Sequence, residues 1–256
     1  MNPDKSSLAN VAYQFRTTRW SLVLLSAQSQ APGYQVALGE LYRIYWYPLY
    51  GYVRRRGHTP EEAQDLTQGF FLHLLEHKTL GRADPEKGKF RSFLLGSLQK
   101  FLSTEGARAR CLKRGGNVQF VPIEMQAAED RYRLEPTDYL TAERIFDARC
   151  AMTLLAEVLN RLRQEYATEG KTSTFEALNV FLDPVNSRAP VSCEEAATRL
   201  QVTIGGVKTL IHRLRKRYTA LLREEVGRTV SEPGKIDEEI HALCEALIAT
   251  EGRLGP

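Results

Sequence analysis

The stretch from residue 192 to residue 223 constrains the fold most strongly, because its pattern predicts two helices separated by a short turn. Ser192 and Glu195 have the spacing of a capping box that opens the first helix, and residues 201–203 form the turn. Apolar residues then recur at helical spacing along the second helix: Val207, Leu210, Ile211, Leu214, Tyr218, Leu221 and Leu222. Two such helices indicate a helix-turn-helix.

The other face of the second helix is polar and basic, and no acid occurs between Arg199 and Arg223. Such a surface suits phosphates and guanine edges. The alternative is a solvated basic helix in an ordinary bundle. We expect the DNA-contacting residues of this helix to be Lys208, Thr209, His212, Arg213, Arg215, Lys216 and Arg217.

The chain as a whole is predicted to be all-α, because spacings of three and four recur and alternating strand patterns are nearly absent. We expect two small helical domains joined by a linker, the second ending in the helix-turn-helix. Irregular, acid-rich sequence separates them. The predicted parts are a leader at 1–16, a first domain at 17–116, a linker at 117–143, a second domain at 144–228 and an acidic extension at 229–256.

The charge is unevenly distributed. Residues 87–116 carry eight Lys or Arg against one acid, whereas residues 124–147 carry seven acids against three bases. The basic block at 87–116 and the basic second helix of the helix-turn-helix therefore flank an acidic block. This arrangement suggests two separate surfaces for nucleic acid. The aromatic residues between the first block's charges, Phe90, Phe93 and Phe101, have core spacing and are expected to pack inside.

Motifs for other functions are weak. Residues 73–77, His-Leu-Leu-Glu-His, match the spelling of one zinc peptidase class, but no third ligand stands in a suitable context. The four cysteines are scattered, and no glycine-rich phosphate loop or local catalytic base occurs. We therefore expect neither an enzyme nor a cofactor or metal. No apolar run is long enough for a membrane span, and no signal peptide pattern is present, so we expect a cytoplasmic protein.

Three features together resemble a known family. The run LYRIYWYPLYGYVRRRGHTPEEAQDLTQGFFLHLLE is followed by GKFRSFLLGSLQKFL and then, after the linker, by the helix-turn-helix. In this order they resemble bacterial RNA polymerase sigma factors of the extracytoplasmic-function (ECF) subfamily of the sigma-70 family. The resemblance covers roughly residues 17–224. Where many relatives carry Arg-Asn and then Asp in the minus-ten helix, this chain has Gln99-Lys100 and Thr104.

The resemblance implies a non-catalytic subunit that reads the minus-ten and minus-thirty-five promoter elements. Its partners would be core RNA polymerase, through the β′ clamp helices and the β flap, promoter DNA, and in some relatives an inhibitory anti-sigma protein. The implied polymerase-binding residues are Asp65, Leu66, Gln68 and Phe71. The basic residues assigned to the minus-ten region are Arg91, Lys100, Arg108, Arg110 and Arg114.

Two alternatives stay open from the sequence. The chain could instead be a stand-alone helix-turn-helix regulator whose N-terminal bundle senses a signal or dimerises. The acidic extension also has two interpretations: its amphipathic segment at 236–248 either completes a bundle or acts as a built-in regulator that competes with DNA or polymerase.

Overall fold

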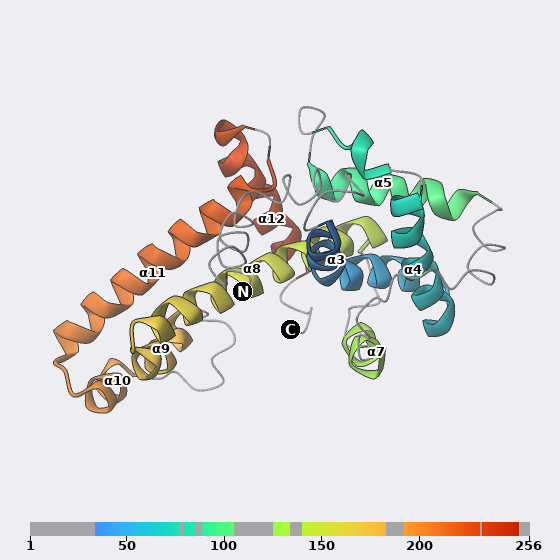
Figure 1. Cartoon of the computed structure of the whole chain (residues 1–256). Coiled ribbons are helices and arrows are strands. Elements are labelled where there is room, and N and C mark those ends of the chain that lie inside the picture. Colours follow the sequence, from blue (N-terminus) through green and yellow to red (C-terminus); the bar gives the residue numbers. More distant parts are fainter. Residues whose placement is uncertain are drawn as a thin grey trace, which may run out of the picture. The chain divides into compact units, whose positions relative to one another are not determined.

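The computed structural model describes residues 34–76, 79–84, 89–104, 125–133, 140–182, 192–230 and 232–250. Throughout these residues the regular structure is helical, without strands, which confirms the predicted all-α fold (Figure 1). The chain folds as two compact units. The first unit comprises Met1–Thr153 and Val226–Pro256, and the second comprises Leu154–Glu225.

The first unit is built around three helices, α3 (Tyr34–Arg55), α4 (Pro60–Glu76) and α5 (Phe90–Ser103). A 3-10 turn at Thr79–Arg82 follows α4. Their apolar faces form one core in which Trp46 stacks on Tyr50 with ring centroids 4.9 Å apart. The predicted core positions Phe90 and Phe101 are buried, and Phe93 packs against the same core.

Further segments add to this unit. They are α7 (Met125–Arg133), the first part of α8 (Ala142–Thr168), the end of α11 (Ile204–Gly227), a 3-10 turn at Pro233–Lys235, and α12 (Ile236–Ala249). The first unit therefore extends beyond residue 116, into the stretch predicted as a linker and into the acidic extension. The amphipathic segment expected at 236–248 is α12, whose Leu243 is buried.

The second unit contains the rest of α8 and α11, with α9 (Thr172–Leu178), a 3-10 turn at Asn179–Phe181, and α10 (Cys193–Leu200) between them. Helical spacing in the sequence predicts a buried stripe along α8 that includes Leu155 and Leu159, and in the structure this stripe is shifted in its middle. Leu154 and Val158 are buried there, whereas the predicted Leu155 and Leu159 are only half-buried.

The spacing of Ser173 and Glu176 in the sequence predicts a capping box there, but the structure does not form it. After α8 the amide of Lys171 donates to the carbonyl of Tyr166 at 2.8 Å, and Gly170 takes the left-handed φ of +69° that this closure requires. Helix α9 then begins at Thr172 with Lys171 as its N-cap residue. Ser173 thus lies inside the first turn of the helix, because the end of α8 determines where α9 starts.

Candidate polymerase and nucleic-acid interfaces

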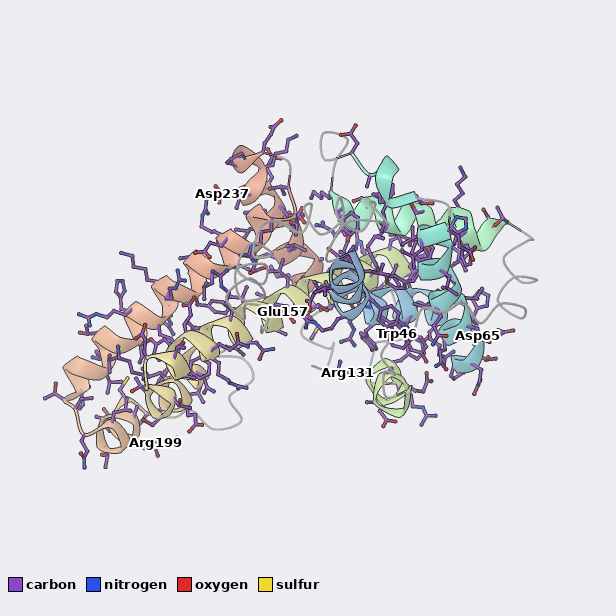
Figure 2. All side chains as sticks on the ribbon, viewed as in Figure 1. Trp46, Asp65, Arg131, Glu157, Arg199 and Asp237 are labelled. Atoms are coloured by element: carbon purple, nitrogen blue, oxygen red, sulfur yellow. The ribbon has the colours of Figure 1, made fainter. Side chains whose placement is uncertain are left out.

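Thr59 and Glu62 have the sequence spacing of a capping box, and α4 begins with that box and presents a polar surface. The hydroxyl of Thr59 accepts from the amide of Glu62, whose carboxylate accepts from the amide of Thr59, both at 3.2 Å. One turn later Asp65 is exposed on the outside of α4 and Gln68 is half-buried (Figure 2). These two of the four predicted polymerase-binding residues are accessible.

The other two predicted polymerase-binding residues lie in the core. Leu66 is 7% exposed and Phe71 is 2% exposed. Phe71 packs edge-on against Tyr42 with ring centroids 4.9 Å apart, and burial raises the pKa of Tyr42 to about 12. These apolar side chains hold α4 in place and do not themselves offer a surface to a partner.

Helix α5 carries the residues expected to meet the opened promoter strand. Lys100 is exposed near its end, whereas Arg91, in its first turn, is 9% exposed. Arg91 Nε donates to Asp147 Oδ1 at 2.7 Å, and its Nη1 forms an ion pair with Glu239. Arg91 is therefore held by protein carboxylates in this structure. Arg108, Arg110 and Arg114 lie outside the described residues.

A departure from the family pattern also has a protein partner. Gln99 Nε2 donates to the hydroxyl of Tyr52 at 3.0 Å and to Glu143 Oε1 at 3.3 Å. Tyr52 donates to the same carboxylate at 3.1 Å. Gln99 thus connects α5 to the start of α8 within the first unit.

Helix α7 is fixed to α3 by a nearly buried carboxylate. Glu129 accepts from Tyr50 at 2.7 Å and from two nitrogens of Arg54, at 2.7 and 3.0 Å. The guanidinium of Arg54 also lies 4.4 Å from the ring centroid of Tyr132. Hydrogen bonding to Arg54 lowers the pKa of Glu129 below its usual range, so this carboxylate is ionised when it holds α7.

The two helices and the short turn predicted for residues 192–223 are present in the structure as α10 and α11. Ser192 and Glu195 make the reciprocal capping box at the start of α10. Gln201 ends that helix with φ of +55°, and the hydroxyl of Thr203 accepts from the amide of Gly206 at 3.1 Å, capping α11. Val207, Ile211, Leu214 and Leu221 are buried as expected, whereas Leu210, Tyr218 and Leu222 are half-buried.

Five of the seven predicted DNA-contacting residues form an exposed face on the first half of α11: Lys208, Thr209, His212, Arg213 and Lys216. Thr209 also donates its hydroxyl to the carbonyl of Gly205 at 3.0 Å. Arg215 is exposed as well, but it donates to the carbonyl oxygen of Phe181 at 2.9 and 3.2 Å.

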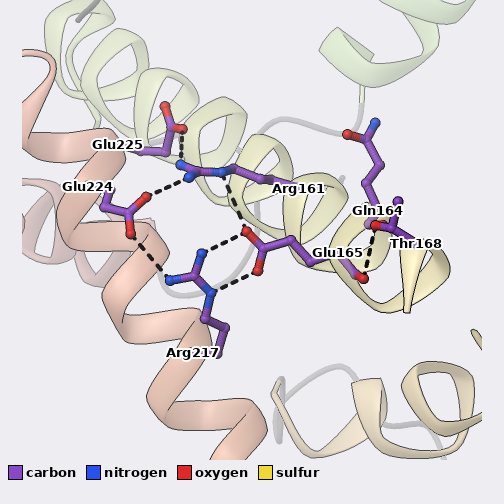
Figure 3. Close-up of polar contacts among 7 residues, drawn as sticks. All are labelled: Arg161, Gln164, Glu165, Thr168, Arg217, Glu224 and Glu225. Carbon is purple, nitrogen blue, oxygen red and sulfur yellow. Dashed lines mark hydrogen bonds and ion pairs between the residues drawn. The ribbon is translucent and has the colours of Figure 1, made fainter. Parts of the chain in front are cut away.

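Arg217 belongs to a network of charges within the second unit (Figure 3). Its Nη2 and Nε contact both oxygens of Glu165, at 2.7 and 2.8 Å, and its Nη1 contacts Glu224 at 3.3 Å. Arg161 joins the same group through Glu224 at 2.6 Å and Glu225 at 3.2 Å. These contacts raise the pKa of Arg217, first through its hydrogen bond with Glu165. Two arginines and three glutamates give the network a net negative charge, which disfavours a phosphate there.

The possible zinc pattern gains no support. His73 packs against Phe101 with ring centroids 5.3 Å apart, and His77 lies outside the described residues. Among the residues that the structure describes, no group of three or more His, Cys, Asp or Glu side chains could hold a metal ion. In the same part of the chain, no helix has the length and apolar character needed to cross a membrane.

The ion pairs that fix these surfaces were not anticipated from the sequence. Glu129, Asp147, Glu165 and Glu239 each pair with an arginine more than fifty residues away. Asp and Glu are common on every solvated helix, so no local sequence signal distinguishes these four paired acids from ordinary surface acids.

Comparison with protein families gives a match for part of the chain. Residues 41–99 match the family model described as Sigma-70 region 2. The match covers most of α3, all of α4 and α5 as far as Gln99, and so includes Asp65, Gln68 and Arg91. Comparisons with curated proteins and with solved structures found no match. A sigma-70 region 2 domain supports a role in binding RNA polymerase and opening promoter DNA.

Proposed function

We propose that the chain is a sigma factor of the ECF subfamily, a non-catalytic subunit that gives RNA polymerase its promoter specificity. The observation that carries the proposal is the Sigma-70 region 2 match over residues 41–99, which spans three helices sharing one core. The resemblance over roughly residues 17–224, in which a helix-turn-helix follows this domain, supports the subfamily. An interaction with RNA polymerase implies a cytoplasmic protein.

The polymerase-binding surface in this proposal is the outer face of α4. Asp65 and Gln68 lie about one helical turn apart, so they can meet the same partner. Leu66 and Phe71 act indirectly, because their burial fixes the helix that carries the polar pair. By resemblance, the partner of this face is the pair of β′ clamp helices.

The two DNA surfaces have different tasks. The exposed face of α11, from Lys208 to Lys216, is suited to a duplex, since a helix-turn-helix places its second helix in the major groove. Lys100 on α5 is assigned to the opened strand of the minus-ten element. Arg215 and Arg217 stabilise the second unit in this proposal, because protein acceptors already engage them.

The alternative, a stand-alone regulator, would use the same α11 face on duplex DNA. It has no need of a polymerase-binding helix. The exposed Asp65 and the half-buried Gln68 within a region 2 match therefore favour the sigma factor.

The test is binding to purified core RNA polymerase. The double variant Asp65→Ala, Gln68→Ala should lose polymerase binding while keeping its helical circular dichroism and melting temperature. Glu61→Ala is the matched control, because Glu61 is an exposed acid in the first turn of the same helix. If the folded double variant binds core polymerase as tightly as the wild type does, the assignment of α4 is refuted. A wild-type chain that binds promoter duplex but no polymerase would instead establish the regulator.

A further inference from the structure

A carboxylate from the C-terminal helix is buried against the start of α5. The side chain of Glu239 on α12 is 3% exposed, and its Oε2 lies 2.6 Å from Lys89 Nζ. The same carboxylate forms an ion pair with Arg91. Burying an unpaired carboxylate is costly, so these two cations are what allow Glu239 to lie inside the first unit.

Lys89 and Arg91 are stabilised by an anion, because their positive charges lie close together. Lys89 is the N-cap residue of α5 and Arg91 lies in its first turn, so two positive charges are held close together. Burial, and then the neighbouring charge of Arg91, lower the pKa of Lys89. Anions at this point relieve the repulsion between them: the charges of Asp147 and Glu238 raise the pKa of Lys89 again, and Glu239 pairs with both cations.

The same two cations stand where the proposed function requires contact with DNA. Both lie within the Sigma-70 region 2 match, at the start of the helix assigned to the opened promoter strand. We propose that Lys89 and Arg91 form one anion-binding site with two alternative occupants, Glu239 of α12 and a phosphate of the opened promoter strand. The C-terminal helix then competes with DNA for the start of α5. This inference rests on the proposed function.

Arg91 keeps a carboxylate partner when Glu239 is exchanged for a phosphate. Its Nε stays on Asp147 at 2.7 Å when Glu239 leaves, so Arg91 retains one carboxylate and frees its remaining donors for a phosphate. The Asp147 side chain is 39% exposed and that of Lys89 is 37% exposed, which leaves solvent access beside the buried Glu239. Only molecules in which Glu239 has left the two cations, here called open, can bind the strand. The apparent affinity therefore equals the intrinsic affinity multiplied by the open fraction.

The experiment measures binding of a labelled single-stranded DNA of mixed sequence to the full chain assembled with core polymerase. Glu239→Gln keeps the size of the side chain but removes its charge and replaces one acceptor oxygen with an NH2 donor. It should raise the affinity at least about threefold, and about tenfold if nine molecules in ten are closed. The matched control is Glu245→Gln, an exposed acid on the same helix, which should change the affinity less than about twofold.

A second measurement uses the wild-type assembly and does not depend on a variant that folds. Adding the oligonucleotide should lower the hydrogen-exchange protection of residues 236–249. Unchanged protection, or a folded Glu239→Gln variant that binds the strand no more tightly than the wild type, would overturn the competition and leave α12 a purely structural helix. Polymerase binding distinguishes failure of this inference from failure of the proposed function. If the wild type and Glu239→Gln both bind core polymerase, the proposed function stands whatever the strand affinity shows. If neither binds core polymerase, the proposed function itself is refuted.

Discussion

Replacing Arg217 with alanine separates an architectural arginine from one that contacts DNA. Arg217 lies on the predicted recognition helix but holds Glu165 through two nitrogens and Glu224 through a third. Its side chain is 41% exposed and that of Glu165 is 31% exposed, so solvent screens the pair. We expect Arg217→Ala to lower the free energy of unfolding by about 1 kcal/mol, the upper end for exposed pairs, because the geometry is bidentate.

The assay combines urea unfolding with the salt dependence of binding to a mixed-sequence DNA duplex. For a chain of this size, about 1 kcal/mol corresponds to a fall of about 2–4 °C in melting temperature. A lost phosphate contact lowers the slope of log affinity against log salt concentration by about 0.9, whereas loss of a purely architectural residue leaves the slope unchanged. Arg217→Ala should therefore lower stability and keep the slope.

Arg213→Ala is the matched control, because Arg213 is exposed on the same helix one turn earlier. It should reduce the slope by about 0.9 with little change in stability. The opposite result for Arg217, an unchanged free energy of unfolding with a slope reduced by about 0.9, would refute the assignment. A double-mutant cycle with Glu165→Gln should also give a coupling energy of about 0.5–1 kcal/mol, since the two side chains are in direct contact.

Two further predictions concern stability. Arg54 lowers the pKa of Glu129 in the folded state. The ionised carboxylate therefore contributes its full stability at pH values above its ordinary pKa of 4.5, and this contribution is lost as the pH falls through the lower pKa of the folded state. Wild-type chain and Glu129→Gln should therefore differ in unfolding free energy at pH 7 and converge in acid, as urea titrations across that range would show; a constant difference would contradict the assignment. Gly205→Ala should stabilise α11 by about 1 kcal/mol in thermal unfolding, because a Cβ there meets only Thr203 Oγ1 at 3.9 Å. Gly206→Ala should gain less, since its Cβ would lie 3.4 Å from that oxygen and 3.5 Å from Val202, and a larger gain at Gly206 would show that space is not the deciding factor.

Local sequence determined those parts of the structure that were predicted correctly. The capping boxes at Thr59 and Ser192 need only a hydroxyl and a glutamate three residues apart. The buried stripe of α11 likewise follows from helical spacing alone. Each of these features lies within one or two helical turns, so the chain carries the whole signal in a single window.

The features that were missed depend on partners that are distant in the sequence. The Ser173 box fails because the closure of α8 at Gly170 determines where the next helix begins. The burial of Arg91 depends on Asp147 and Glu239, 56 residues away in the first case and farther in the second. Charge patterning indicates that a basic residue is present, but it does not indicate whether a carboxylate from another helix already neutralises it.

The return of α12 to the first unit also has a consequence for how the chain is made. Helices α3, α4 and α5 leave the ribosome early, but Glu239 is synthesised long after its partners Lys89 and Arg91. Between Thr153 and Val226 the ribosome adds the whole second unit, Leu154–Glu225, which takes several seconds at about 5–20 residues per second. Throughout this interval the two cations have no C-terminal carboxylate beside them, so the nascent N-terminal helices expose an anion-binding surface that the completed protein covers.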